Sequence, residues 1–352
     1  MTTVLPSGHW PLTAAHDHLT TQLHILDDAS ATPTGITTHA FLPHYPTHPH
    51  LSLLPRTLST LAELNYEHGP HGWKLAPHAG HDAHRVTGEL ADQLDALTIA
   101  GHTATTPFTL TVLGPLTLAT RLWLHHGDRA LADHGAIRDI ASALGEGLSH
   151  TVTRIGALIP RSPLHLQVDE SDLAATLTGL IPTFSGHSRI RAVDPALAVE
   201  VLHRTLDPIA QVVPVTVHTG DSWVGIPTAA RVLADLGSPA HTVHRLGVAL
   251  GPWNERLWEH IATVIEHGVG FHAGLPTPVM SSCAGTDVAG LGDALTTGWH
   301  RVGLPAAQLA EVSIGFHNAA AEHCAGGSVD TARGSIRTLM STAEYVAEKA
   351  EA

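Results

Sequence analysis

The sequence predicts an α/β fold, a (β/α)8 TIM barrel, in a chain of 352 residues. From about residue 34 onward, short β-branched or apolar runs alternate with longer Ala- and Leu-rich segments of helical period, which is the pattern of repeated βα units. Eight such units in about 320 residues favour a closed barrel over the alternative, an open doubly wound sheet. No glycine-rich nucleotide fingerprint follows an early strand, and 43% hydrophobic with 4% aromatic content indicates an aliphatic core.

Each expected strand is a short apolar or β-branched run, a composition that suits a buried pleated surface. In chain order the runs are GITTHA (35–40), LAELNYE (61–67), FTLTVLG (108–114), LHLQVDE (164–170), VPVTVHT (213–219), TVHRLGV (242–248), VGFHAGL (269–275) and AEVSIGF (310–316).

Helices are expected between these strands, for example over 130–158 and 254–268. In the second, Leu257, Ile261, Val264 and Ile265 share one face, so that face is expected to pack on the barrel. A glycine at position 268 is expected to end this helix.

The domain organisation expected is an N-terminal helical extension over residues 1–33 and a barrel domain over 34–352. The segment FLPHYPTHPHLSLLP (41–55) is expected to be irregular, because successive prolines remove backbone donors and oppose helical geometry.

Charge and cysteine content exclude several classes of function. The 18 Lys and Arg against 32 Asp and Glu give a net charge of −14 without a basic run, so a nucleic-acid partner is not expected. The 30 histidines would bring the protein close to neutrality near pH 6.5, where about half of them carry a proton. Two widely separated cysteines, Cys283 and Cys324, suit a reducing compartment, and the chain shows no secretion or membrane segment, so a cytoplasmic location is expected.

Polar residues gather where the expected strands end, which in a barrel is the face that carries catalysis. With 30 histidines in the chain, a histidine at any one strand end is also compatible with a loop or satisfied core role. The strand-end residues are His39, Glu67, His68, Thr117, Asp169, Glu170, His218, His244, His272 and His317, with His323 and Cys324 close to the last.

The run LHLQVDES places two adjacent carboxylates, Asp169 and Glu170, at the expected barrel mouth. Repulsion between them is costly unless a cation such as a substrate ammonium compensates it. A helix N-cap or a salt bridge at the rim is the alternative role for either residue. The expected substrate-binding residues are Asp169 and Glu170, together with Thr117 and Glu67 at other strand ends.

Four segments, in this order, resemble the catalytic barrel of cobalamin-independent methionine synthase. A segment like GWKLAPHAGHD (72–82), which precedes them, is similar to the shorter single-barrel actinobacterial relatives, so the resemblance covers about residues 34 to 350. It implies a barrel of the methionine synthase and uroporphyrinogen decarboxylase type. The four segments are FTLTVLGPLTLA (108–119), LHLQVDES (164–171), VTVHTG (215–220) and GSVDTARGSIRTL (327–339).

The resemblance implies a methyltransferase of methionine biosynthesis, which moves a methyl group from a methyl-folate or similar donor to a thiol such as that of homocysteine. A zinc ion would convert the thiol, of pKa about 8.5, to the thiolate. By similarity, Asp169 would hold the amino-acid ammonium and His218 would be a zinc ligand, which makes these two the expected catalytic residues. Cys324 would be the second metal ligand.

The sequence departs from the family pattern at the metal ligands. Gly220 stands where the His-x-Cys pair of the family requires cysteine, the expected sixth strand has no glutamate, and a gapless alignment puts Glu322 at the place of the last cysteine. Catalytic zinc sites use three protein ligands and an open position. The site could be rebuilt from His218, Cys324 and one of His244, His272, Glu322 or His323, or the metal is lost.

Three functions therefore follow as alternatives. The first is zinc-assisted methyl transfer with a modified metal site. The second is a non-catalytic barrel that binds an amino acid or folate-like molecule. The third is metal-free decarboxylation of the uroporphyrinogen type, which ranks last because GITTHAFLPHY (35–45) lacks the arginines needed to hold many substrate carboxylates.

Overall fold

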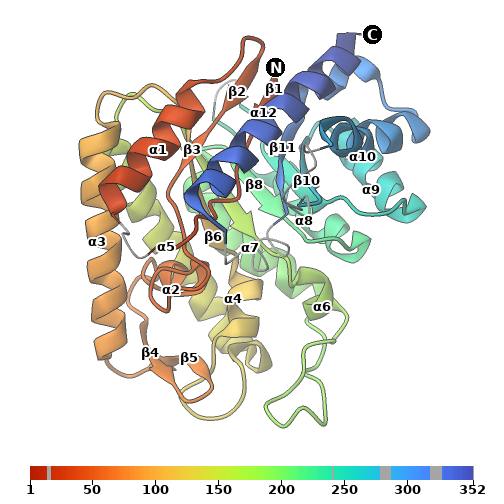
Figure 1. Cartoon of the computed structure of the whole chain (residues 1–352). Helices are drawn as coiled ribbons and strands as arrows, with labels where there is room; N and C mark the ends of the chain where they lie inside the picture. Colours follow the sequence, from red (N-terminus) through yellow and green to blue (C-terminus); the bar gives the residue numbers. More distant parts are fainter. Residues whose placement is uncertain (14–16, 240–241, 278–286, 318–326, 352) are drawn as a thin grey trace.

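The computed structural model of the protein describes residues 1–13, 17–239, 242–277, 287–317 and 327–351. Nine parallel strand segments form its main sheet (Figure 1): β1 (Thr2–Val4), β2 (Ile36–Thr38), β3 (Ala40–Phe41), β6 (Phe108–Leu113), β7 (Leu164–Asp169), β8 (Val215–His218), β9 (Arg245–Ala249), β10 (Gly270–Leu275) and β11 (Ser313–Phe316). Their order in the sheet is β2-β1-β11-β10-β9-β8-β7-β6-β3.

The two ends of this sheet are halves of one strand, because His39 alone separates β2 from β3. β2 pairs with β1 and β3 pairs with β6. Backbone hydrogen bonds from His39 N to Val4 O (3.0 Å) and from Ala40 N to Pro107 O (2.8 Å) complete the closure. Counted as one strand, β2 and β3 reduce nine segments to eight, so the predicted (β/α)8 barrel is confirmed.

Two parts of the strand prediction are wrong. The first barrel strand is β1, within the residues expected to form a helical extension, and three residues give too little sequence pattern to reveal it. The run 61–67 does not enter the barrel. Instead β4 (Asn65–Gly69) pairs with β5 (Gly72–Ala76) in an antiparallel hairpin, which Gly72 turns with a φ of +118°.

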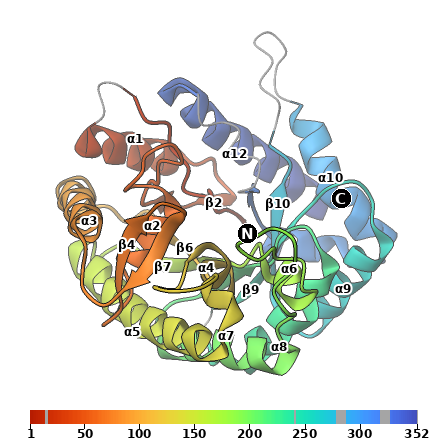
Figure 2. The same ribbon diagram turned by 90° about the horizontal axis from the view of Figure 1, so that it is seen from below.

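Helices surround the barrel, as Figure 2 shows. Longer ones connect successive strands on the outside, and shorter ones lie among the loops. They are α1 (His18–Ser30), α2 (Leu53–Leu58), α3 (His81–Gly101), α4 (Pro115–Arg121), α5 (His134–Leu158), α6 (Leu173–Leu177), α7 (Pro195–Ala210), α8 (Ile226–Asp235), α9 (Glu255–Glu266), α10 (Val288–Arg301) and α12 (Val329–Glu351), with 3-10 turns at Ala130–Ala132, Trp223–Gly225 and Ala306–Glu311.

Local chemistry explains where these helices begin and end. The predicted helix over 130–158 is confirmed as α5, whose first turn is capped by the Asp133 carboxylate. The predicted helix over 254–268 is confirmed as α9, which buries its apolar face and is capped by Asn254. Gly268, with a φ of +82°, follows its end, as expected.

The barrel interior is unusually polar. Along β7, alternation points Leu166 and Val168 toward the helices and His165 and Gln167 toward the barrel axis. A cross-strand contact of 2.8 Å from His165 Nε2 to Thr216 Oγ1 confirms the inward direction. Imidazoles and hydroxyls therefore fill space that aliphatic side chains fill in many barrels.

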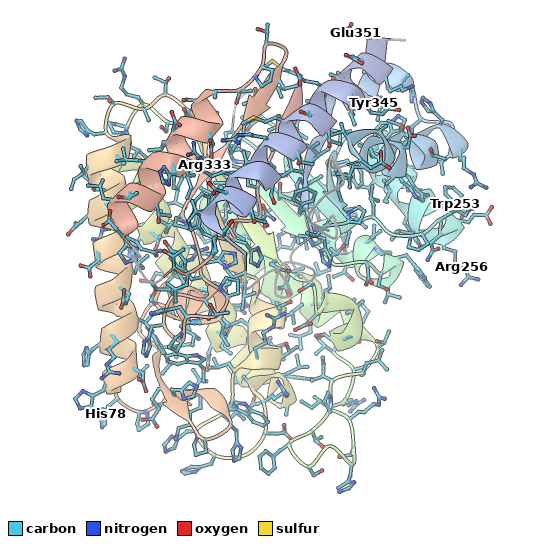
Figure 3. All side chains as sticks on the ribbon, in the orientation of Figure 1. His78, Trp253, Arg256, Arg333, Tyr345 and Glu351 are labelled. Carbon is cyan, nitrogen blue, oxygen red and sulfur yellow. The ribbon has the colours of Figure 1, made fainter. Side chains whose placement is uncertain are left out.

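The last helix fastens the end of the chain to its beginning. Figure 3 shows Arg333 of α12 directed at α1, where its Nε and Nη2 donate to the two oxygens of Asp28, both at 2.7 Å. Among the described residues, no helix combines the length and the apolar character needed to cross a membrane. The cytoplasmic location stays a prediction.

Candidate functional site

A cavity of about 610 Å³ opens at the carboxyl ends of the strands, the end of the barrel that Figure 2 faces. We call it the mouth cavity. Its charged and imidazole side chains belong to residues that follow different strands, so only the closed barrel brings them together. These residues are His9, His44, Arg121, Asp169, Asp172, Asp221 and His317.

Asp169 is the last residue of β7 and the register partner of His218 at the end of β8. Its carboxylate is 3% exposed and accepts a hydrogen bond from Ser171 N at 2.9 Å. Its negative charge acts to raise the pKa of His9, His218 and His317, which places it electrostatically among three imidazoles. The predicted catalytic residues Asp169 and His218 are thus neighbours.

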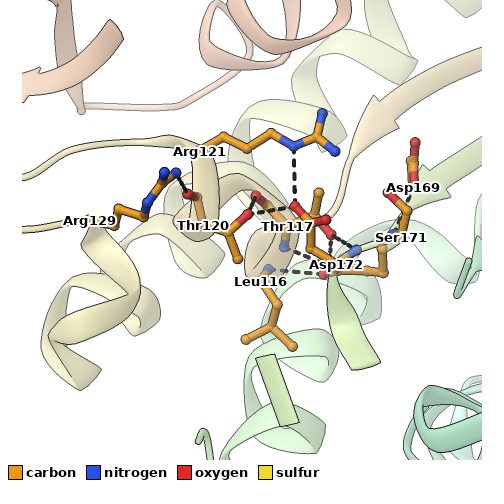
Figure 4. Close-up of polar contacts among 9 residues, drawn as sticks. Leu116, Thr117, Thr120, Arg121, Arg129, Asp169, Ser171 and Asp172 are labelled. Carbon is orange, nitrogen blue, oxygen red and sulfur yellow. Dashed lines mark hydrogen bonds and ion pairs between the residues drawn. The ribbon is translucent and has the colours of Figure 1, made fainter. Parts of the chain in front are cut away.

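Glu170 points away from the cavity into the protein. Figure 4 shows this region, where Leu116 N (2.9 Å), Thr117 N (2.7 Å) and Thr117 Oγ1 (2.7 Å) all donate to the Glu170 carboxylate at the start of α4. Burial raises the pKa of Glu170 to about 7, with a smaller contribution from Asp169, against the lowering effect of these hydrogen bonds. Glu170 and Thr117 are fully buried, and in this geometry they shape the loop after β6.

In the part of the chain that the structure describes, one guanidinium lines the mouth cavity. Arg121, at the end of α4, pairs with Asp172 through Nε at 3.3 Å, and both side chains are about one-third exposed. The Asp172 carboxylate also accepts a hydrogen bond from Thr120 Oγ1 at 2.7 Å, and its backbone N donates to Thr117 Oγ1 at 3.2 Å. Figure 4 shows these contacts, which hold both partners in place, and both residues line the mouth cavity.

His218 does not line the mouth cavity itself, but it contacts His317, which does. Its ring stacks on that of His317, with centroids 5.0 Å apart and planes 15° apart. His218 Nδ1 accepts from Gly220 N at 3.2 Å, so the neutral ring carries its proton on Nε2. That Nε2 is buried without a partner in the described part of the chain. Burial lowers the pKa of His218 to about 4, and burial also lowers the pKa of His317.

Two further histidines were not found from the sequence. His9 and His44, with ring centroids 4.2 Å apart, line the cavity beyond β1 and β3. His44 Nε2 donates to Ser7 O at 3.2 Å, and His9 Nδ1 lies 2.9 Å from Ser7 Oγ. Burial lowers the pKa of His9 to about 4 and that of His44 well below its usual value. Recognition of β1 as a strand would have placed His9 in the loop that follows a strand end.

Other predicted residues lie apart from the mouth cavity. Glu67 is in the β4–β5 hairpin, where its carboxylate pairs with Lys74 Nζ at 2.8 Å. His244 precedes β9 at the amino end of the barrel, with Nδ1 accepting from Val215 N and Nε2 donating to Gly237 O. His272 lies inside the barrel, 3.1 Å from Ser313 Oγ through Nδ1. Cys324, like Glu322 and His323, lies outside the described residues.

The described residues do not form the predicted zinc centre, because no group of three His, Cys, Asp or Glu among them is arranged to hold a metal ion. The absence of cysteine at position 220 has a physical reason. Gly220 has a φ of +77°, and a Cβ there would lie 3.0 Å from Ser171 O. A cysteine would be strained in this loop, so His218 has no family-type partner at that position.

The cavity is suited to a small molecule that carries both charges. Among the described residues, three carboxylates (Asp169, Asp172 and Asp221) and one guanidinium line the cavity, so this part of the wall favours an ammonium group and offers one place for an anionic group. The imidazoles are neutral at neutral pH because burial lowers their pKa, so they can accept or donate a proton.

Comparison with solved structures agrees with this architecture. The chain is similar to a B12-independent methionine synthase from Shewanella sp. W3-18-1 in complex with selenomethionine, with a TM-score of 0.59 and 12% identity, over 99% of this chain and 97% of the other. At this identity the likeness shows the barrel fold alone. No protein-family model and no curated protein sequence matches the chain.

Proposed function

We propose that the mouth cavity binds a sulfur-containing amino acid and that the protein transfers a methyl group to its thiol, in the manner of the methionine synthases that it resembles. The observation that carries this proposal is the buried Asp169 carboxylate in the same cavity as Arg121. The solved neighbour holds selenomethionine, an amino acid with a methylated selenium in place of sulfur, which supports a ligand of this size and charge.

In this proposal the ammonium of the amino acid binds at Asp169, and Asp221 adds negative charge on the same wall. The carboxylate of the amino acid binds Arg121, which keeps Asp172 as its second partner. A guanidinium suits this role because its planar fork can hold two carboxylates at once. Glu170, Thr117 and Glu67, also expected from the sequence to bind substrate, would act only indirectly from their observed positions.

Methyl transfer to a thiol requires loss of the thiol proton, because the thiolate is the nucleophile. We propose that His317 accepts this proton, since its ring lines the cavity and is neutral at neutral pH. The sulfur then forms its bond to the methyl carbon, and the donor leaves with the electrons of the bond that breaks. Asp169 stabilises the resulting imidazolium, as its charge favours the protonated form of His317.

Zinc, if bound, would supply thiol activation. The ligand roles of His218 and Cys324 stay predictions, and no step above depends on them. Metal analysis of untagged protein purified without chelators tests them. One zinc per chain that is lost on His218→Ala would support the pair, whereas less than about a tenth of an equivalent would contradict it.

Binding is tested first by calorimetry with L-methionine and L-homocysteine. Asp169→Asn is expected to weaken the affinity by about tenfold or more, because it removes a buried carboxylate from an ammonium. Glu67→Gln is the matched control and should bind like wild type, since Glu67 faces Lys74 in the hairpin. N-acetyl-L-methionine, which lacks the ammonium, should not bind. Equal affinity in wild type and Asp169→Asn would contradict the proposed amino-acid site.

Turnover separates methyl transfer from the second candidate, a barrel that binds the amino acid without reaction. The second candidate is favoured by Gly220 and by the lack of a three-ligand metal group among the described residues. Methionine formed from homocysteine and a methyl-folate, with and without added zinc, is measured by mass spectrometry. Product that disappears in Asp169→Asn supports methyl transfer, and tight binding without product supports the binding protein.

A further inference from the structure

A second cavity, of about 550 Å³, lies at the opposite end of the barrel, where the strands begin. We call it the amino-face cavity. It contains the starts of β1, β9 and β10, and Figure 1 shows β1 at the top of the barrel. It shares no lining residue with the mouth cavity. Its polar side chains include Thr3, His39, His165, Arg245, Gln308 and Glu311.

Arg245, the first residue of β9, brings a cation to this cavity. Its register partner on β10 is Gly270, where a Cβ would lie 2.8 Å from Arg245 Cγ, so the glycine makes room for the side chain. Burial lowers the pKa of Arg245, and the charge of Glu311 partly opposes this. The fold thus holds a partly exposed guanidinium at the wall of this cavity.

This guanidinium lacks an anionic partner in the described part of the chain. Arg245 Nε is buried with no hydrogen bond, and the one contact of its Nη1 is with Val243 O at 3.5 Å. Glu311 lines the same cavity but makes no ion pair within 4.0 Å of Arg245. Arg245 is partly exposed to the cavity and its buried Nε has no acceptor, so the guanidinium can take an oxyanion as its partner.

Two imidazoles beside Arg245 complete the polar wall. His39 Nδ1 lies 2.9 Å from Thr109 Oγ1, and His165 Nε2 lies 2.8 Å from Thr216 Oγ1. The two rings meet edge to face, with centroids 5.7 Å apart. Each ring uses one nitrogen on a threonine, which leaves the second nitrogen as a hydrogen-bonding group for a ligand.

We propose that the amino-face cavity is a binding site for a small oxyanion, a carboxylate or a phosphate group, held by Arg245 with hydrogen bonds from His39 and His165. The site is independent of the proposed methyl transfer, because it lies at the other end of the barrel. Arg245 supplies the charge and a planar set of donors, which match the oxygens of either group. Glu311, exposed at the rim, opposes anion entry through its charge.

The experiment is calorimetry at pH 7.5 and constant ionic strength with sodium phosphate and, in a separate arm, sodium malonate. Wild type is expected to bind at least one of them, and the arm that binds identifies the oxyanion. Arg245→Gln is expected to weaken this binding by about tenfold or more. Glu311→Gln, a change at an exposed residue, is expected to strengthen it about twofold to fivefold, because it removes a repulsive charge.

A melting temperature separates a ligand site from a structural arginine. Arg245→Gln should melt at the same temperature as wild type or higher, because it removes an unpaired cation, and it should bind amino acids at the mouth unchanged. Arg121→Gln, a loss of the guanidinium at the mouth, should leave binding at the amino face unchanged. The proposal is overturned if neither anion binds wild type, if Arg245→Gln binds as wild type does, or if Glu311→Gln weakens binding.

Discussion

The imidazole rings of His218 and His317 are stacked, with centroids 5.0 Å apart, and only His317 lines the mouth cavity. His218 is held behind it by the hydrogen bond from Gly220 N and by close approach to two glycines, Gly247 on β9 and Gly274 on β10. A side chain on either glycine would approach the His218 ring within 3.0 Å. His218 therefore positions His317 from behind the cavity wall.

Gly274→Ala tests this positioning. A Cβ at this residue would lie 2.9 Å from His218 Nε2, so the imidazole must shift and carry His317 with it. We expect a destabilisation of about 1 to 3 kcal/mol, as for overpacked cores, together with weaker amino-acid binding at the mouth. Denaturant unfolding and calorimetry measure the two effects. Gly251→Ala, where a Cβ meets nothing within 4 Å, is the control, and equal behaviour of the two variants would contradict the positioning role.

Acid should unfold this protein, because several histidines are buried in the neutral form. Burial lowers the pKa of His9 and His218 to about 4 and that of His39 to about 3, and lowers those of His44, His165 and His272 well below 6.5. As the pH falls below about 6.5 the unfolded chain takes up protons that the folded chain does not, so stability is lost down to about pH 4 for His9 and His218 and to about pH 3 for His39. Each such histidine contributes up to about 1.4 kcal/mol per pH unit.

Glu170 has the opposite effect on the pH dependence of stability. Its pKa is raised to about 7, so between pH 7 and about 4.5 the folded state binds a proton that the unfolded state lacks, which favours folding as the pH falls. One such group cannot offset six histidines. Urea unfolding at pH 7.5, 6.5 and 5.5 measures the balance, and a free energy of unfolding that stays constant or rises over this range would contradict the prediction. The expected neutrality near pH 6.5 also shifts lower, because these six rings stay uncharged.

Much of the barrel could be predicted from sequence because its longer strands are compact β-branched runs. FTLTVL and VTVH bury every residue and end at polar residues or turns. The sequence alone therefore shows where each strand extends and where it ends. Thr2–Val4 lacks this signal, since three residues show no period, and only its pairing with β2 and β11 identifies it. The closure at His39 likewise depends on pairing between residues distant in sequence.

The residues of the candidate site were likewise predictable only in part. Asp169 and His218 were predictable because each is the last residue of a strand, and parallel strands of a barrel end on one face. His9, His44 and Arg121 lie in loops or after a short helix, where no period marks them. Glu170 looked equivalent to Asp169 by adjacency, yet successive residues at a strand end point in opposite directions, and Glu170 turns toward α4.

The Glu170 contact with α4 gives a stability prediction. Glu170→Ala leaves Leu116 N, Thr117 N and Thr117 Oγ1 buried without their acceptor, which should cost about 2 to 4 kcal/mol. Gly114→Ala should also destabilise, because its Cβ would lie 2.4 Å from Glu170 Cδ. In the double variant this clash is gone, so the two costs should fall short of additivity by about 1 kcal/mol or more. Urea unfolding measures the costs. Additive costs would show that the Glu170 side chain is not the reason why position 114 requires glycine.

The bond between the two ends of the chain gives the last prediction. Arg333 on α12 holds both oxygens of Asp28, a carboxylate that is 6% exposed, whereas Arg337 approaches the same carboxylate only to 3.8 Å with its own side chain 65% exposed. Arg333→Met should cost about 2 kcal/mol, because it leaves a buried carboxylate without its main partner. Arg337→Met should cost less than about 0.5 kcal/mol.

Denaturant midpoints measured at low salt and at about 0.5 M NaCl distinguish the two arginines further, since screening weakens exposed pairs most. The effect of Arg333→Met should persist in salt, because Asp28 is buried between α1 and α12 and its two hydrogen bonds are short. Asp28→Asn should cause most of the same destabilisation, because the amide replaces one acceptor oxygen with a donor that faces the Arg333 guanidinium. Equal costs for the Arg333 and Arg337 variants would mean that the charge of α12, and not this bidentate contact, joins it to α1.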